Sequence, residues 1–290
     1  MTLVNLSKIQ KDAQLNKYGI CAPEIWDQFS AKAFIEAASE TRSPVILIIG
    51  VPILLKLGIK SVAQMVKSYA DETDIPIVLH LDECQDAEII FKSISAGFTS
   101  VMFDGAELGL NLEENIKQTK NIVQFAHYMG ITVEASLGRM PLSADGTINS
   151  LKLPMVKTKP EEAKRFCQET GVDAFAPSIG NYHECYKEAW PNPDFDLAKK
   201  IYDMTDNVPM VAHGCTGMSK EQLGKALNSG FVKFNTGTLY QVFFRSKIKD
   251  HVDEFEGYPA SFSILYAAMG DLKNYLKDQI VNNFKSANRY

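Results

Sequence analysis

The sequence predicts a single (β/α)8 TIM barrel with extra helices at its C-terminal end. Two observations support this fold. Eight short apolar runs recur along the chain, and stretches with the spacing of an amphipathic helix separate them. The runs are nearly continuously apolar rather than alternating, as in parallel strands that helices cover. A doubly wound open sheet is the alternative, because the sequence alone does not show strand order.

The expected strands are short and rich in β-branched residues. Most of them end in a polar or Gly-containing segment, which is typical of a strand that runs into a loop. In chain order they cover residues 18–25, 44–50, 76–82, 100–105, 132–138, 174–180, 209–214 and 232–237.

Helices are expected between the strands, and several carry end signals. Pro160 suits the first turn of a helix, and Gly171 suits its C-cap. Ser219 and Gln222 fit a capping box at the start of another helix. The clearest amphipathic stretches are 30–40, 112–130, 159–171 and 219–230.

Two further segments complete the expected organisation. The apolar stretch 43–59 contains Gly, Pro and Lys, so we interpret it as a buried strand followed by a loop rather than as a membrane span. From about residue 239 the chain is expected to form the eighth helix and one or two more. We therefore expect one domain over residues 1–290.

Composition narrows the class of protein. The chain is 46% hydrophobic and carries a formal net charge of −5, which argues against a sequence-independent grip on nucleic acid. Five cysteines without a CxxC pair argue against a disulfide framework and favour a reducing cytoplasm. We expect neither a secretory leader nor a membrane span.

Polar residues gather where the predicted strands end, which is the catalytic end of a TIM barrel. Histidines and acids are prominent among them, and random placement would scatter them over the chain. The set comprises His80, Asp82, Glu83, Asp104, Glu134, Gly180, His183, His213 and Asn235.

Two loops at this end have features of an anion site. Gly214 and Thr216 precede the capped helix that begins near Ser219, so backbone amides and a helix N-terminus could approach a phosphate. Asn235 and Thr238 belong to the neighbouring loop, in the segment "NTGT". Phosphate sites after the seventh and eighth strands recur in TIM barrels.

With these motifs the sequence resembles the class II fructose-bisphosphate and tagatose-bisphosphate aldolases. The resemblance runs from about Leu6 to the eighth strand and is carried by "HLDECQDAE", "AGFTSVMFDGAEL", "VEASLG", "VAHGCTG" and "VKFNTGT". It implies reversible aldol cleavage of a phosphorylated ketose, giving a product similar to dihydroxyacetone phosphate. It also implies a divalent metal that acts as a Lewis acid, and a homodimer or homotetramer.

The resemblance also assigns roles to individual residues. Asp82 matches the catalytic aspartate, and His183 and His213 match two metal ligands. Asn235 matches the asparagine that contacts the substrate. From their positions rather than from the resemblance, His80, Asp104 and Glu134 are expected to support the site; His80 could orient Asp82 or be a packed barrel residue, and Glu134 could support a metal ligand or fill the barrel interior. The phosphate would be held by Gly180, Gly214, Thr216 and Thr238.

Three departures from the family pattern bear on the chemistry. Glu83 stands where the family has its first metal-binding histidine, and Ser136 replaces a family glutamate. In the loop after the fifth strand the nearest acid is Asp145, which could replace the family's proton-transferring glutamate. Glu83 could ligate zinc or manganese together with His183 and His213.

Alternatives stay open at this point. Without a metal, Glu83 and the two histidines could act as acids and bases in a metal-independent aldolase, a transaldolase-like enzyme or an isomerase on the same scaffold. A non-catalytic sugar-phosphate-binding protein is a further alternative. It is disfavoured because a protein without activity has no need of Asp82 beside both histidines.

Overall fold

The computed structural model describes residues 3–187, 193–216, 218–254 and 261–290, and it confirms the predicted barrel. Eight parallel strands follow the order β1-β8-β7-β6-β5-β4-β3-β2. A backbone bridge between Glu24 and Ile48 links β1 to β2, and Ile25 N–H donates to Ile48 O, so the sheet closes on itself. The strands are β1 (Ile20–Pro23), β2 (Val45–Gly50), β3 (Ile77–Cys84), β4 (Ser100–Phe103), β5 (Thr132–Leu137), β6 (Ala174–Pro177), β7 (Met210–Ala212) and β8 (Phe231–Thr236).

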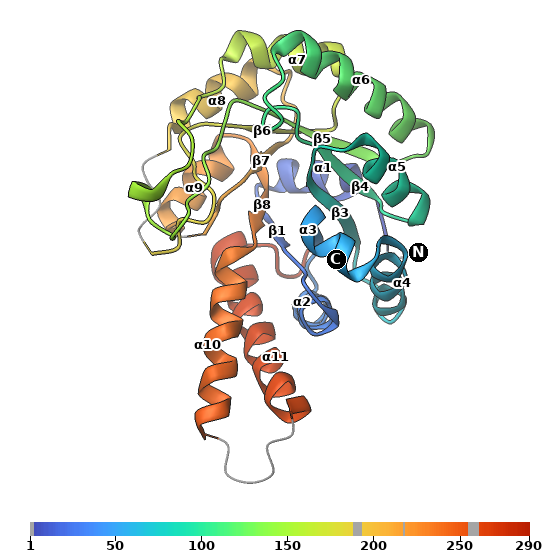
Figure 1. Cartoon of the computed structure of the whole chain (residues 1–290), viewed down its shortest axis with the longest axis vertical. Coiled ribbons are helices and arrows are strands. Elements are labelled where there is room, and N and C mark those ends of the chain that lie inside the picture. Colours follow the sequence, from blue (N-terminus) through green and yellow to red (C-terminus); the bar gives the residue numbers. More distant parts are fainter. Residues whose placement is uncertain (1–2, 188–192, 217, 255–260) are drawn as a thin grey trace.

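Helices surround the barrel on its outer side (Figure 1). Their end signals agree with the sequence, since Pro160 begins α7, Gly171 is its C-cap, and Ser219 and Gln222 form a capping box on α9. The helices are α1 (Leu6–Asn16), α2 (Gln28–Glu40), α3 (Val51–Leu57), α4 (Ile59–Ala70), α5 (Ala87–Ala96), α6 (Leu112–Tyr128), α7 (Pro160–Thr170), α8 (Phe195–Met204), α9 (Lys220–Asn228), α10 (Thr238–Glu254) and α11 (Ser261–Asp278).

One local expectation is wrong. The segment after β2, read from the sequence as a loop, forms α3 and continues into α4 after Gly58. Pro52 lies in the first turn of α3, where its missing N–H costs nothing, so this proline starts a helix rather than excluding one.

Two apolar layers hold the fold together. The larger core lies between the strands and the outer helices, as in other parallel barrels. A smaller core fills the barrel interior, and there Ile20, Val78 and Met102 pack with Leu6 and Ile9 of α1. Helix α1 therefore covers the N-terminal end of the barrel, which leaves the opposite end free for polar groups.

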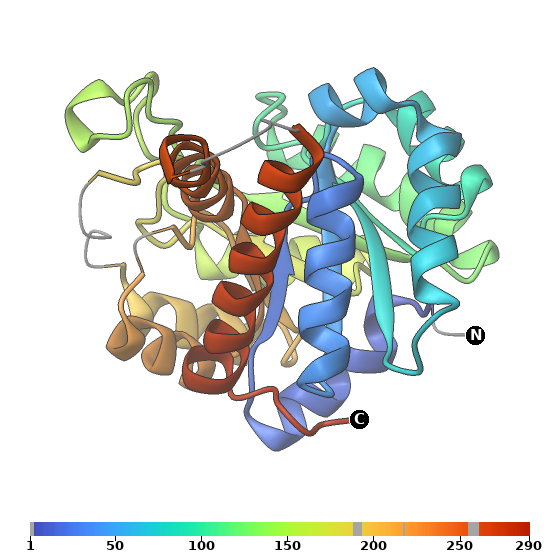
Figure 2. The ribbon, with the colours of Figure 1, turned by 90° about the horizontal axis from the view of Figure 1, so that it is seen from below.

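The C-terminal helices form a projecting pair. Helices α10 and α11 extend together away from the barrel (Figure 1), and α11 also lies beside α2 (Figure 2). The expected C-terminal helices are thus confirmed. No helix in the described part of the chain is long and apolar enough to cross a membrane.

Candidate active site

The end of β3 carries two neighbouring acids that reach the same cavity. In a regular strand, Asp82 and Glu83 would point to opposite faces. Here the pairing of β3 with β4 shifts register between Leu81 and Cys84, and Glu83 adopts a left-handed backbone with φ of 49°. This unusual backbone allows both side chains to line the pocket at the carboxyl end of the barrel.

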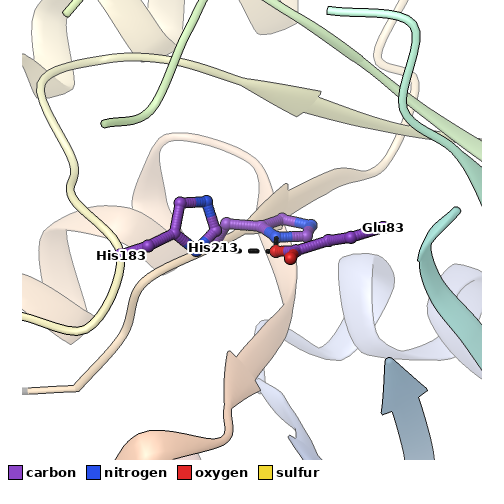
Figure 3. Close-up of side chains that lie close together, drawn as sticks. All are labelled: Glu83, His183 and His213. Carbon is purple, nitrogen blue, oxygen red and sulfur yellow. Dashed lines mark hydrogen bonds and ion pairs between the residues drawn. The ribbon is translucent and has the colours of Figure 1, made fainter. Parts of the chain in front are cut away.

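Glu83 meets two histidines from other strands (Figure 3). Its Oε1 lies 3.0 Å from Nδ1 of His213 and 3.5 Å from Nδ1 of His183. His213 follows β7 and is buried, whereas His183 lies in the loop after β6 and is partly exposed. The potential ligand atoms of these three residues all lie within 4.8 Å of one another, so the group could hold a metal ion.

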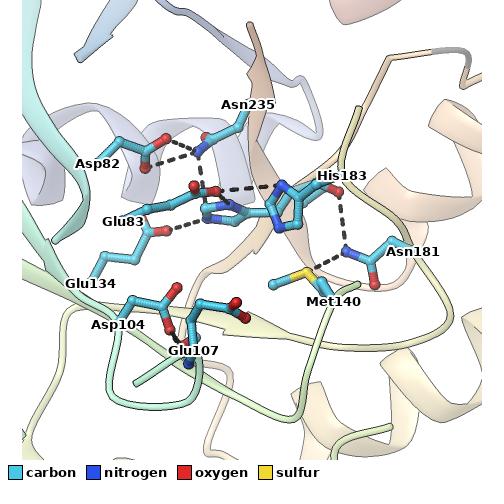
Figure 4. A network of polar contacts seen from close by, with 12 residues as sticks. Asp82, Glu83, Asp104, Glu107, Glu134, Met140, Asn181, His183 and Asn235 are labelled. Atoms are coloured by element: carbon cyan, nitrogen blue, oxygen red, sulfur yellow. Dashed lines mark hydrogen bonds and ion pairs between the residues drawn. The ribbon is translucent and has the colours of Figure 1, made fainter. Parts of the chain in front are cut away.

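A second carboxylate fixes the ring of His213. Its Nε2 lies 2.9 Å from Oε1 of Glu134, which is fully buried on β5 (Figure 4). Burial disfavours the imidazolium, but the hydrogen bonds to Glu134 and Glu83 prevail and raise the pKa of His213 to about 10. In the metal-free arrangement His213 therefore holds protons on both nitrogens and donates one to each carboxylate.

A buried lysine lies below this group. Nζ of Lys233, on β8, donates to Oε2 of Glu134 at 2.6 Å and to Nε2 of His80 at 3.1 Å, and it lies 3.9 Å from Asp82. Ser100 occupies the other nitrogen of His80, at 2.8 Å. Burial and the charge of Lys233 both lower the pKa of His80, so its imidazole stays neutral.

Lys233 also neutralises a second acidic group that could otherwise be taken for a metal site. His80, Asp82 and Glu134 lie close enough together to suggest a metal site. The ammonium of Lys233 already contacts this group and supplies the positive charge that the two carboxylates require. The charges of this cluster are therefore already paired within the protein.

Asn235 fixes the catalytic candidate Asp82. Its Nδ2 donates to both carboxylate oxygens of Asp82, at 3.1 and 3.0 Å (Figure 4). Burial opposes ionisation of Asp82, but Lys233 and the nearby histidines hold its pKa below the usual range, so it is a carboxylate at neutral pH. Oδ1 of Asn235 is buried and accepts no hydrogen bond from the described residues.

Asp82, Glu83, His183, His213 and Asn235 line a cavity of about 550 Å³ that opens to solvent. Gly214 has φ of 68°, and a Cβ there would lie 2.0 Å from the carbonyl oxygen of Tyr182, so only glycine fits. Gly180 is buried and lies outside the described lining. The lining consists of Glu24, Ile48, Asp82, Glu83, Leu142, His183, Glu184, His213, Gly214, Thr216, Asn235, Gly237 and Thr238.

Two predicted site residues make local contacts instead. The carboxylate of Asp145 accepts hydrogen bonds from Thr147 and Ser150, is exposed and lies outside the pocket lining. Asp104 accepts from the hydroxyl of Ser136 at 2.6 Å and from the N–H of Glu107. It is buried near the site and does not contact the proposed metal ligands directly.

Lys233 and Glu24 are charged residues of the site that were not singled out from the sequence. Lys233 could have been recognised, because a lysine inside the apolar run "VKFNTG" must find a partner if the strand is buried. Glu24 gave a weaker signal, since it falls near the end of the expected strand 18–25 and in the structure lies just beyond β1. Its side chain nevertheless lines the cavity beside Asp82.

Known proteins share this architecture. The chain was compared with protein families, with individual proteins and with solved structures. The family model "Fructose-bisphosphate aldolase class-II" matches residues 4–289. A fructose-bisphosphate aldolase from Geobacillus stearothermophilus is 33% identical over 253 residues, which is 86% of each chain. The chain belongs to the class II fructose-bisphosphate aldolase family, and it is an aldolase-type carbon–carbon lyase.

Solved structures extend this likeness over nearly the whole chain. The YdjI aldolase from Escherichia coli K12 is 28% identical with a TM-score of 0.86, and the match covers 99% of both chains. A putative fructose-1,6-bisphosphate aldolase from Coccidioides immitis is 24% identical with a TM-score of 0.85, covering 98% of this chain and 97% of that one. At that identity the second likeness supports the fold alone.

Proposed function

We propose that this protein catalyses metal-dependent, reversible aldol cleavage of a phosphorylated ketose, with a zinc or manganese ion held by Glu83, His183 and His213. The observation that carries the proposal is the position of Glu83. Its Oε1 faces Nδ1 of His213 at 3.0 Å and Nδ1 of His183 at 3.5 Å. The resemblance to the family would place a metal-binding histidine at this position.

The donor set fits a divalent cation on chemical grounds. Two imidazoles and one carboxylate are a common catalytic set that leaves further positions open for substrate. The hydrogen bond from His213 Nε2 to Glu134 is the support that a metal-ligating histidine usually receives, because it orients the ring and makes the other nitrogen more basic. A bound cation would polarise the substrate carbonyl and stabilise the charge that develops on its oxygen.

Asp82 is suited to act as the base that takes the proton from a substrate hydroxyl, whose oxygen becomes the aldehyde oxygen. As a carboxylate it would take the proton from the hydroxyl next to the bond that breaks, so that this carbon becomes the aldehyde. The electron pair of the broken bond passes to the ketone half. The two hydrogen bonds from Asn235 hold Asp82 in one orientation for this transfer.

The remaining groups are suited to hold the phosphorylated ketone half. Oδ1 of Asn235 is buried without a partner among the described residues, so a substrate hydroxyl would satisfy it. Gly214, Thr216 and Thr238 all line the cavity and would offer hydroxyl groups and backbone amides to a phosphate. Gly180, which lies outside the described lining, remains part of the predicted phosphate site through the resemblance alone.

The ketone half also needs a proton on carbon, and Asp145 remains our prediction for that step. In the present arrangement its carboxylate is bound to Thr147 and Ser150. Residues 139–158 would have to rearrange for Asp145 to reach the cavity, as loops in this position of barrel enzymes often do.

A Schiff-base mechanism without metal has little support from the lysine in the barrel. Lys233 is fully buried and ion-paired with Glu134 at 2.6 Å, whereas Schiff-base chemistry needs a neutral amine in contact with the substrate carbonyl. A chelator distinguishes the remaining metal-independent alternatives, because it would leave such an enzyme active.

The proposed reaction is tested by incubating purified protein with a panel of ketose 1-phosphates and 1,6-bisphosphates and detecting dihydroxyacetone phosphate with a coupled enzyme. We expect cleavage of at least one sugar, loss of cleavage with chelator and recovery with zinc or manganese. Cleavage that persists in metal-free protein would overturn the metal-dependent reaction. Isomerised sugar without cleavage would overturn the lyase reaction.

A further inference from the structure

Glu24 is a pocket residue that the proposed reaction does not use. Its backbone closes the barrel through the bridge to Ile48. Its carboxylate is fixed in place, because Gln241 Nε2 donates to Oε2 at 2.7 Å and the backbone N–H of Gly50 donates to the same group. A side chain held by two donors from different elements presents its charge at one defined place in the cavity.

Two neighbouring glycines leave the space that the carboxylate of Glu24 occupies. A Cβ at Gly237 would lie 2.7 Å from Oε2 of Glu24, and a Cβ at Gly50 would lie 3.3 Å from Oε1. Any larger residue at Gly237 would therefore displace the carboxylate. The glycine at the end of β2 and the glycine after β8 therefore make room for an acid beside the end of β3.

The cavity around it is acidic. Glu24, Asp82, Glu83 and Glu184 line it, and none of the described lining residues is a lysine or an arginine. A bound divalent cation would offset charge near Glu83 and the histidines. No described lining residue supplies positive charge near Glu24. Binding a phosphate dianion there would ordinarily require arginine or lysine.

The proposed reaction places the two halves of the substrate. The phosphate of the ketone half lies in the loops after β7 and β8, and Asp82 lies at the bond that breaks. The aldehyde half must therefore continue past Asp82. Glu24 lies on that side, because the backbone N–H of Gly50 on β2 donates to its carboxylate and Gly50 pairs with Asp82, whereas Gly214 and Thr216 follow β7, beyond β1 and β8.

We propose that Glu24 is a specificity-determining residue that restricts the substrate to ketoses with one phosphate, because its carboxylate favours a hydroxyl and opposes a second phosphate at the aldehyde end. This inference rests on the proposed function and names its substrate class. A carboxylate accepts hydrogen bonds from sugar hydroxyls, whereas a phosphate carries a charge of about −1.5 to −2 at neutral pH and is repelled.

The test compares kcat/KM for two matched sugars, fructose 1-phosphate and fructose 1,6-bisphosphate, and for the corresponding tagatose pair, at pH 8 with metal-loaded protein. The variants are Glu24→Gln, which removes the charge, and Glu24→Asp, which keeps it. Glu72→Gln, an exposed acid before β3 at the other end of the barrel, is the control. Calorimetric binding of each sugar gives a readout that does not depend on turnover.

We expect the wild-type protein to prefer the monophosphate of at least one pair by about tenfold or more, which corresponds to the repulsion of one partly screened charge. Glu24→Gln should reduce that ratio by about tenfold, while Glu24→Asp and Glu72→Gln retain it. The inference is overturned if the wild type prefers the bisphosphate, if the ratio is unchanged in Glu24→Gln, or if that variant loses turnover of both sugars equally.

The two proposals fail in different ways. If the monophosphate binds more tightly but neither sugar is cleaved, the lyase reaction is wrong and the selectivity of Glu24 stands. If neither sugar binds, both are overturned.

Discussion

Nδ1 of His213, which follows β7, lies 3.0 Å from Oε1 of Glu83 on β3 and donates its proton to that carboxylate, where a cation could bind. Glu134 occupies the other nitrogen of the ring at 2.9 Å. A metal ion that uses Nδ1 must first displace the proton that His213 holds there. Metal binding and protonation are therefore linked at this residue.

The first prediction concerns this linkage. Because the pKa of His213 is raised to about 10, the metal-free ring is protonated at neutral pH, and binding of one manganese ion should release about one proton. The Kd should then fall about tenfold per pH unit between pH 6 and 8. Calorimetry in buffers with different ionisation enthalpies measures the released proton. A Kd that does not change with pH would contradict the linkage.

Asp82 provides the second prediction. Asp82→Asn keeps the size of the side chain but cannot accept the hydroxyl proton, so kcat for ketose cleavage should fall about 10²- to 10⁴-fold. Metal content should stay as in the wild type, because Asp82 is not in the proposed ligand set. Stopped-time product assays and elemental analysis on the same preparation separate the two effects. Turnover within a few-fold of wild type would exclude Asp82 as the base.

Lys233 provides the third prediction, which concerns stability. Lys233→Met leaves the buried carboxylate of Glu134 without its ion-pair partner, and the free energy of unfolding should fall by about 3–5 kcal/mol. The double variant Lys233→Met with Glu134→Gln removes both charges and should recover part of that loss. Denaturant unfolding measures both. Additive losses in the double variant would show that the pair is not coupled.

Glu24 provides the fourth prediction. Burial, with the charges of Asp82 and Glu83, raises its pKa to about 7 from the ordinary 4.5. Between pH 4.5 and about 7, Glu24 keeps its proton in the native protein but has lost it in the unfolded chain. The contribution of Glu24 to stability therefore falls as pH rises through this window and is constant above it.

Glu24→Gln should remove this dependence. Relative to wild type, the variant should gain up to about 3 kcal/mol of unfolding free energy when the pH is raised from 5 to 8. Chemical denaturation at the two pH values gives the difference directly, with Glu72→Gln as a control that should show none. An equal offset at both pH values would show that Glu24 does not titrate in this range.

The barrel could be predicted from the sequence because each strand carries its own local signal. Continuous apolar runs, capping residues such as Ser219 and the helix-starting Pro160 are all readable within a few positions. The prediction of a loop after β2 was wrong for a related reason. Pro52 is compatible with a loop and with a first helical turn, and only its packing in the barrel decides between them.

The site was less accessible to sequence reasoning because it depends on backbone irregularity and on partners far apart in the chain. Alternation along β3 would send Glu83 away from Asp82, and the register shift that brings it back has no local signature. The pairing of Lys233 with Glu134 joins residues 99 positions apart. For Glu24, the deciding neighbour is Gly237, whose missing side chain leaves the space that the carboxylate fills.

The central claim is that Glu83 completes a metal site with His183 and His213. Elemental analysis of untreated wild-type protein beside Glu83→Ala tests it most directly, with titration of manganese into both after chelation. We predict about one divalent ion per wild-type chain. The variant should bind manganese at least about 100-fold more weakly, because it loses one ligand of three. A wild-type protein that is fully active without metal, or a variant that binds metal as tightly as wild type, would contradict this account.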